Sequence, residues 1–222
     1  MKAKVILFVV EGSSDEAAFM PWIEEELKRL KLKVTVKVVR GDILTKYIEY
    51  SKEFEVNPSN VKGEVKKLIN NYLQSSLVKS NQIKLNDIEK VYYVTDTDDC
   101  FRDENNNSIN KRKCLMKMFN FESLEMNLTK NINFEVIFFA KNLEDVICSK
   151  KSATDEEKKK ISIEFGKKAM KESDFFRNIF INDNLKIWSS YPESYDGIKE
   201  YKGRACNMNV LIKEIDNKNL IE

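Results

Sequence analysis

The chain of 222 residues contains no histidine. This absence excludes Ser-His-Asp and Cys-His catalysis, imidazole general bases, zinc or haem sites with histidine ligands, and histidine-based pH switches. An enzyme built from this chain must therefore use carboxylates, lysines, hydroxyls, thiols or a metal ion held by oxygen atoms.

The chain also lacks cysteine motifs, long apolar runs and an excess of either charge. Its four cysteines form no C-x-x-C pair, so we expect reduced thiols rather than a zinc ribbon or a thioredoxin-type motif. No stretch reaches the roughly 20 apolar residues of a membrane span, and acids rather than small residues follow the first apolar run. The 38 basic and 36 acidic residues nearly cancel, so bulk charge indicates no nucleic-acid partner. We expect a cytoplasmic globular protein.

Four segments have the apolar or β-branched composition of buried strands, and helical patterns separate them. The expected strands are Val5–Val10, Lys33–Val39, Lys90–Thr95 and Phe134–Ala140. The expected helices are Asp15–Leu32 with Ser14 as its N-cap, Ser59–Lys79 and Lys111–Leu128, with a loop at Asp103–Asn110. This alternation predicts an α/β fold in which helices flank both faces of a mostly parallel, Rossmann-like sheet.

The pattern changes after residue 150. Helices are expected at Thr154–Glu172, Phe175–Ile181 and Asn207–Ile215, and Ile187–Tyr191 is ambiguous. We expect residues 1–150 to form the α/β domain and residues 151–222 to form a mainly helical extension packed on it.

Acidic residues follow three of the four expected strands. They are Glu11 and, four residues later across a turn at Gly12, Asp15; then Asp96 and Asp98; then Glu144 and Asp145. In an open parallel sheet, ligands bind at the carboxyl ends of the strands. Carboxylates gathered there repel one another unless a cation neutralises them, and oxygen ligands favour Mg²⁺ or Mn²⁺. Two such ions can activate water and stabilise the leaving oxygen in phosphodiester cleavage.

Each acidic motif also has a simpler interpretation. Glu-Gly is common where a strand turns into a helix, and Asp96 and Asp98 are residue types that form turns. Glu144 suits the positive end of a helix dipole. The agreement of all three motifs at one predicted edge of the sheet favours a metal site.

The segments VILFVVEGSSDEAAF and VYYVTDTDD resemble the topoisomerase-primase (TOPRIM) domain, which has a Glu-Gly turn after its first strand and Asp-x-Asp after its third. The segment KNLEDVI resembles the acidic segment after the fourth strand in the TOPRIM domains of overcoming-lysogenization-defect (OLD) nucleases. The resemblance covers roughly residues 3–150 and implies a Mg²⁺- or Mn²⁺-dependent nuclease acting on DNA or RNA. It further implies that Glu11, Asp96 and Asp98 hold one ion, and that Asp15 and Glu144 hold a second.

Nucleases of this family also place a lysine near the scissile phosphate, for which Lys167 or Lys168 is the candidate. OLD proteins join the TOPRIM domain to an ATPase, whereas this chain has no G-x-x-x-x-G-K-[ST] phosphate loop. The chain therefore looks like a stand-alone TOPRIM protein whose partner, an ATPase or another subunit, is a separate polypeptide. Small proteins of this kind are often linked to defence against phage.

Two basic clusters are candidate contacts for nucleic-acid phosphates. They are Lys111-Arg112-Lys113, and Lys199, Lys202 and Arg204 near Tyr195 and Tyr201. Taken alone, each cluster is better explained as an ordinary solvated surface.

Three other functions remain open. A phosphatase of the haloacid dehalogenase type also has Asp-x-Asp after a strand, but at the start of its domain and with threonine or valine where Cys100 stands. A receiver domain does not have the Glu11-Gly12 turn. A non-catalytic module would keep the acids and bind a partner subunit. Metal-dependent cleavage of DNA or RNA distinguishes the nuclease from all three.

Overall fold

The computed structural model describes residues 4–44, 47–48, 53–75, 83–150, 153–181 and 184–220. Its centre is a five-stranded sheet in the order β2-β1-β5-β7-β6, in which β6 alone runs antiparallel to its neighbour. The strands are β1 (Lys4–Val10), β2 (Val34–Arg40), β5 (Ile88–Asp96), β6 (Ser123–Asn127) and β7 (Lys130–Phe139), and β3 (Tyr47–Ile48) pairs with β4 (Glu53–Phe54) in a separate hairpin. The predicted α/β class and mostly parallel sheet are confirmed.

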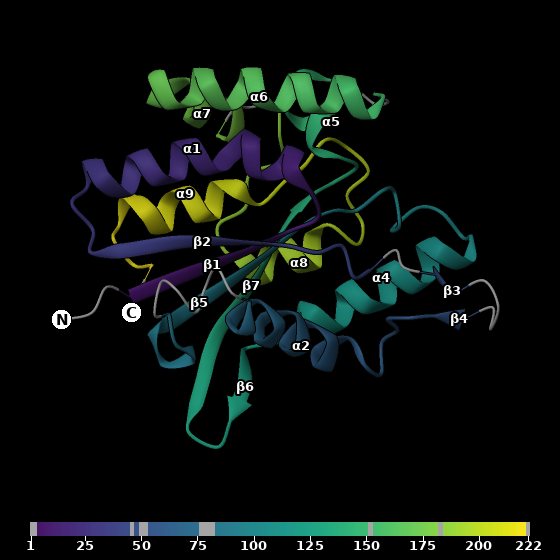
Figure 1. The fold of residues 1–222 in the computed structure, drawn as a ribbon. Helices are drawn as coiled ribbons and strands as arrows, with labels where there is room; N and C mark the ends of the chain where they lie inside the picture. Colours follow the sequence, from purple (N-terminus) through teal and green to yellow (C-terminus); the bar gives the residue numbers. More distant parts are fainter. Residues whose placement is uncertain are drawn as a thin grey trace.

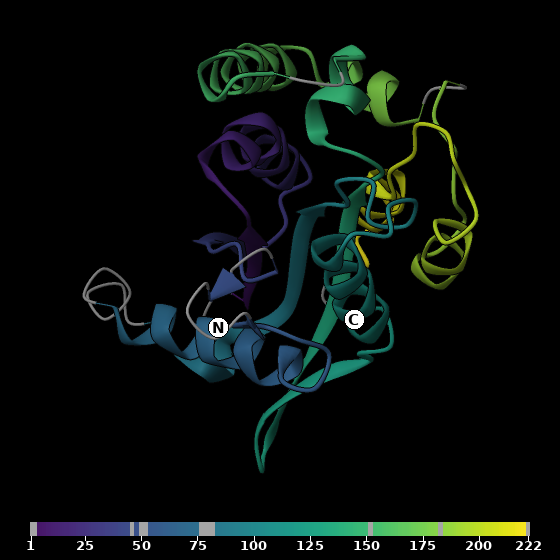
Figure 2. The ribbon, with the colours of Figure 1, turned by 90° about the vertical axis from the view of Figure 1, so that its right-hand side faces the viewer.

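Helices cover both faces of the sheet, as Figure 1 shows. One face carries α1 (Ser13–Arg29) and α9 (Met208–Asp216), and the other carries α2 (Val61–Gln74) and α4 (Asn106–Met118). Figure 2 shows α6 (Asp155–Lys171) as an outer layer on α1, with α7 (Ser173–Phe180) following it. The shorter helices are η1 (Leu85–Asp87), α5 (Leu143–Cys148) and α8 (Tyr191–Gly197). Among the described residues, no helix is long and apolar enough to cross a membrane.

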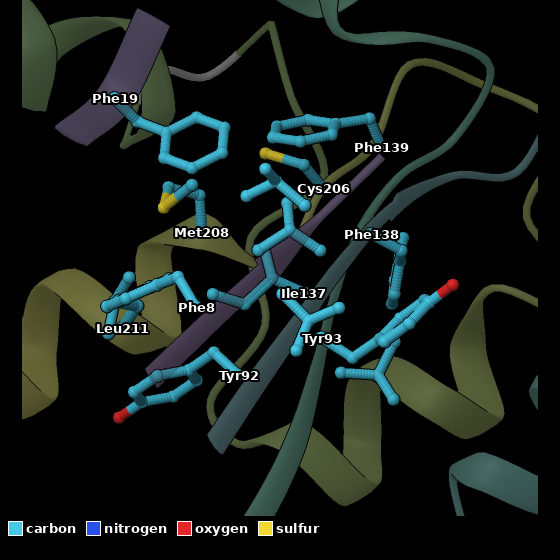
Figure 3. Packing of buried hydrophobic residues seen from close by; sticks show 14 of the residues in the cluster. Phe8, Phe19, Tyr92, Tyr93, Ile137, Phe138, Phe139, Cys206, Met208 and Leu211 are labelled. Atoms are coloured by element: carbon cyan, nitrogen blue, oxygen red, sulfur yellow. The ribbon is translucent and has the colours of Figure 1, made fainter. Parts of the chain in front are cut away.

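Alternation along the strands sends large aromatic side chains to both faces of the sheet. Phe8 of β1 and Tyr92 of β5 stack with ring centroids 5.0 Å apart, and Figure 3 shows them beside Leu211 of α9. The next residue, Tyr93, points to the opposite face with Phe138, as the two-residue period of a strand requires. Because both of their faces are buried, the central strands β1 and β5 are nearly continuous apolar runs rather than alternating ones.

A buried ion network connects α1 with α7 and α9. The Glu26 carboxylate, 2% exposed, accepts hydrogen bonds from Arg29 at 2.6 Å, from Arg177 at 2.9 Å and from Ser173. Arg177 also donates to both carboxylate oxygens of Asp216, at 2.6 and 2.7 Å. Burial alone would raise the pKa of Glu26, but the hydrogen bonds from Arg29, Ser173 and Arg177 outweigh it and lower the pKa to about 2. Glu26 is therefore a charged anchor for the outer helices at neutral pH.

At the part of the β7 edge that β6 does not cover, side chains from the C-terminal part of the chain form hydrogen bonds with the backbone of β7. The Val136 amide donates to the Tyr195 hydroxyl at 2.7 Å, and the Phe138 amide donates to Asn207 Oδ1 at 2.9 Å. Asn207 Nδ2 donates in return to the Val136 carbonyl at 2.9 Å. These contacts replace a further strand and join the residues after α7 to the same core.

The start of α4 differs from the sequence prediction. The loop expected at Asp103–Asn110 is wrong from residue 106 onward, because α4 begins at Asn106. Asn105 Oδ1 accepts a hydrogen bond from the Ser108 amide at 2.9 Å and so caps the helix. A run of asparagines that suggests a loop is thus the capped first turn of a helix.

The helix expected at Lys111–Leu128 is also too long. It ends at Met118, and Ser123–Asn127 forms β6 instead. Leu124 pairs with Ile132 of β7, and both side chains are fully buried. Burial of this alternating segment against a neighbouring strand outweighs the helical spacing of the apolar residues before it.

The other predicted helix bounds and caps differ less from the structure. Gly12, not Ser14, is the N-cap of α1. The second predicted helix ends at Gln74, and residues 76–79 of that prediction lie outside the described residues. Residues 187–190 form a loop before α8, and the bounds of α6, α7 and α9 agree with prediction to within two residues.

The β7 edge contacts generate a stability prediction. We expect Asn207→Leu to lower the free energy of unfolding by about 2–4 kcal/mol, because it takes a partner from two buried backbone groups. The exposed Asn133 on the same strand is the matched control, and Asn133→Ala should change stability by less than about 0.5 kcal/mol. Urea unfolding followed by circular dichroism measures both, and equal losses would contradict this role of Asn207.

The Glu26 network generates a prediction of pH dependence. Since the folded pKa of about 2 lies below the ordinary 4.5, charged Glu26 adds stability above about pH 4.5 and loses it as the pH falls toward 2. We expect Glu26→Gln to be less stable than the wild type by about 2–3 kcal/mol at neutral pH. The difference should narrow between pH 4.5 and 2 in urea unfolding, and a constant difference would contradict the prediction.

Candidate active site at the carboxyl edge of the sheet

Glu11 and Asp15 lie at the junction of β1 and α1. The Gly12 amide donates a hydrogen bond to Asp15 Oδ2 at 2.9 Å, which fixes Asp15 one turn along the chain from Glu11. Gly12 has an extended backbone with φ −147°, and a Cβ there would meet no atom within 4 Å. The chain bends at Glu11 and Gly12, as expected, but without a left-handed glycine, and the capping hydrogen bond positions Asp15.

Asp96 is the last residue of β5 and lies close enough to Glu11 for their charges to interact. Thr95 Oγ1 donates a hydrogen bond to Glu11 Oε1, and the Leu143 amide donates to Asp96 Oδ1 at 3.0 Å. Asp98 has a left-handed backbone with φ +47°, and its side chain is 55% exposed. The strand ends at Asp96, so Asp98 lies in the turn that follows rather than in an extended segment.

Glu144 and Asp145 lie in the first turn of α5, after β7. The helix cap Asn142 accepts a hydrogen bond from the Asp145 amide at 2.8 Å. Both acidic side chains are buried, and within the described structure Glu144 Oε2 and Asp145 Oδ1 have no hydrogen-bond partner. A buried carboxylate oxygen without a partner is costly, so this corner of the site favours a hydrogen-bond donor or a cation.

Burial and mutual repulsion raise the pKa values of these acids. Burial raises the pKa of Glu11 to about 7 although Lys111 opposes the shift. Burial, reinforced by the charge of Glu144, raises the pKa of Asp15 to about 6. The pKa of Asp96 is raised well above its ordinary value by burial and then by the charges of Glu11 and Asp15. The three strand ends thus bring their acids into one electrostatic cluster.

Lys111 of α4 is the cation inside this cluster. Its ammonium lies 2.6 Å from Asp98 Oδ2 and 3.5 Å from Glu11 Oε1, and its side chain is 4% exposed. Burial alone would lower the pKa of Lys111, but the two carboxylates raise it and keep the group charged. Lys111 is therefore not a surface contact. The sequence indicates this burial by helical spacing, because Lys111 stands three residues before Cys114 and four before Leu115, both buried on the apolar side of the helix.

The oxygen donors of these residues are of the type that binds a hard divalent cation, but they are not arranged around a common point. In the part of the chain that the structure describes, no three acids or cysteines are arranged to hold a metal ion. The Lys111 ammonium lies between the carboxylates of Glu11 and Asp98. The donors are carboxylate oxygens, and Glu144 offers one that is buried without a partner. Mg²⁺ or Mn²⁺ therefore suits this donor set once Lys111 releases its carboxylate partners.

The lysines of α6 take no part in the contact of Lys111 with Asp98 and Glu11. Lys167 is exposed, whereas the α6 lysine whose charge acts on Asp15 is Lys158, nine residues or about 13.5 Å earlier along the helix. The Lys168 ammonium lies 4.1 Å from the centre of the Phe175 ring. Neither Lys167 nor Lys168 is hydrogen-bonded or ion-paired to the described acids of the cluster. The role of Lys167 stays a prediction, and Lys111 is the lysine that contacts these acids.

The two basic clusters contain several residues with structural contacts. Arg112 pairs with Glu104 at 3.0 Å, Tyr195 is buried against β7, and Arg204 donates to a carbonyl of α5 at 2.7 Å. Of the residues considered as phosphate contacts, the exposed ones are Lys113, Lys199, Lys202 and Tyr201.

Scans against models of protein families, curated proteins and solved structures find no match for this chain. The likeness to TOPRIM domains therefore rests on the sequence motifs at Glu11, Asp96 and Glu144. Any function has to be argued from the acids themselves and from what surrounds them.

The raised pKa of Asp15 generates a prediction. Its folded pKa of about 6 lies above the ordinary 3.8, so the charged form costs stability at higher pH. Asparagine can still accept the Gly12 hydrogen bond but carries no charge. In EDTA we expect Asp15→Asn to be more stable than the wild type by about 1–3 kcal/mol at pH 8, with the difference vanishing below about pH 4. Thermal unfolding across pH measures this, and a destabilised variant at pH 8 would contradict the repulsion.

Proposed function

We propose that this chain is a nuclease-like hydrolase that uses Mg²⁺ or Mn²⁺ to cleave phosphodiester bonds in DNA or RNA. The observation that carries the proposal is that acids from three strand ends form one electrostatic cluster, in which the Lys111 ammonium contacts Glu11 and Asp98. We call these acids the carboxylate cluster: Glu11, Asp15, Asp96, Asp98 and Glu144. Five acids against one nearby buried lysine leave an excess of negative charge that a divalent cation would neutralise.

The hydrogen bonds around the carboxylate cluster suit this task. Glu11 is held by Thr95, Asp96 by the Leu143 amide, and Asp15 by a backbone amide, in each case through one carboxylate oxygen. Each group is thereby fixed in orientation while its second oxygen can face a ligand. Bound ions would polarise the scissile phosphate and lower the pKa of a water molecule, chemistry that requires no histidine.

The TOPRIM resemblance extends the proposal. Glu11, Asp96 and Asp98 would hold one ion, and Asp15 and Glu144 the second. By the same resemblance we propose an OLD-like TOPRIM domain that works with an ATPase or another subunit in defence against phage.

The phosphatase alternative is disfavoured by the contacts of its expected acid-base residue. That residue would be Asp98, which is ion-paired with the Lys111 ammonium at 2.6 Å. The same ion pair favours the other alternative, a non-catalytic module, because it neutralises part of the site without a metal ion.

Metal-dependent cleavage tests the proposal. With Mg²⁺ or Mn²⁺ added to EDTA-treated protein, we expect hydrolysis of plasmid DNA, single-stranded DNA or RNA. Asp96→Asn and Glu11→Gln should each lower the rate by about 100-fold or more, because each removes a charged oxygen ligand. Gel electrophoresis of labelled substrates measures the rates.

The matched control is Glu24→Gln, which neutralises an exposed acid on α1 and should cleave like the wild type. Calorimetric titration with Mn²⁺ provides a readout that does not depend on turnover. Absence of both hydrolysis and Mn²⁺ binding would reject the nuclease and leave the non-catalytic module.

A further inference from the structure

A cavity of about 220 Å³ opens directly beside the carboxylate cluster. Asp98 and Lys111 form its charged side, and Asn107 and Ser108 from the first turn of α4 line it with polar groups. Leu44 and Phe54, from the segment between β2 and α2, contribute apolar surface. One small cavity therefore combines a cation, hydrogen-bonding groups and an aromatic ring.

Lys111 belongs both to this cavity and to the carboxylate cluster. An ammonium group has three N–H donors, and the contacts to Asp98 and Glu11 engage two of them. Among the described residues no third acceptor contacts this ammonium, and because Lys111 lines the cavity its third donor can reach an acceptor there. A phosphate oxygen there would lie next to the acids proposed to hold the metal ions.

The apolar side of the cavity suits a different part of the same ligand. A nucleobase is flat and apolar on its faces and polar at its edges, which matches a wall of Phe54 and Leu44 next to the amide of Asn107. An inorganic anion would leave this apolar surface unused. The volume suits one base at most, and a base that is paired and stacked in a duplex cannot enter without being flipped out.

We infer that this cavity receives one unpaired nucleotide of the substrate, with its base against Phe54 and its phosphate on Lys111, so that the protein acts on single-stranded nucleic acid. This inference rests on the proposed function, whose substrate class it specifies. The carboxylate of Asp98 in the cavity wall repels a phosphate. Binding of the nucleotide therefore requires a divalent cation to neutralise that acid, and the two ligands strengthen each other's binding.

The test compares two tryptophan variants on one helical turn. Asn107→Trp fills the cavity, whereas Asn106→Trp places the same side chain at an exposed position outside the residues that line it. The probes are fluorescein-labelled ten-residue oligo-dT and oligo-U and a hairpin duplex, with Ca²⁺ as the cation and EDTA as the reference. Fluorescence anisotropy gives the affinities.

We expect the wild type and Asn106→Trp to bind the single strands in Ca²⁺ at least about tenfold more tightly than the duplex or than in EDTA. Asn107→Trp should lose about tenfold in affinity for the single strands. Phe54→Leu, which removes the ring but keeps apolar volume, should also lose about tenfold in affinity for the single strands. If Asn107→Trp does not fold, the affinity of Phe54→Leu tests the inference in its place.

Equal affinities of the folded Asn106→Trp and Asn107→Trp variants, or preference of the wild type for the duplex, would overturn the cavity as a nucleotide site. If calorimetry still shows Mn²⁺ binding in that case, the proposed metal site stands and only the substrate class is wrong. If the single strand binds as strongly in EDTA as in Ca²⁺ and calorimetry shows no Mn²⁺ binding, the proposed function and the required cation both fail, and the cavity is left as a single-strand site only.

Discussion

The central physical constraint in this protein is the burial of several carboxylates at one edge of a sheet. Water cannot fully solvate them there, so protein groups have to stabilise each charge or a proton has to remove it. Backbone amides serve Asp15 and Asp96, a hydroxyl serves Glu11, and one ammonium serves Glu11 and Asp98. The raised pKa values of Glu11 and Asp15 show that this stabilisation is incomplete. This remaining demand for positive charge is what the cation in the proposed function would meet.

The sequence was sufficient to predict the sheet and the edge where its acids gather. Runs such as Val5–Val10 indicate buried parallel strands because both faces of each strand are covered, and parallel strands place their carboxyl ends together. The same information could not predict the backbone conformation at Asp98, because Asp98 and Asp99 are two successive left-handed residues in a turn. Nor could it predict β6, because Leu124 becomes buried only through pairing with a strand that follows it in the chain.

Lys111 shows a further limit of sequence patterns. In a lysine-rich chain, a Lys-Arg-Lys run has the composition of a solvated surface, and its neighbour Arg112 indeed pairs with a nearby acid, Glu104. Only the three-dimensional arrangement places the first lysine of the run against Glu11, which is 100 residues away in the sequence. The apolar spacing with Cys114 and Leu115 shows that this lysine faces inward, but not which acid it meets. Long-range charge pairing is therefore the part of the site that sequence periodicity cannot supply.

The C-terminal part of the chain supports the loops that carry the site. Arg102, in the loop after Asp98, donates to the carbonyl of Lys202, and Arg204 donates to the carbonyl of Val146 in α5. The same segment continues into Asn207, which satisfies the edge of β7. These contacts connect the residues that follow α8 to both the Asp98 loop and the helix that carries Glu144. Because one short segment contacts both the loop after Asp98 and the helix that carries Glu144, the residues after position 150 contribute to the framework around the site.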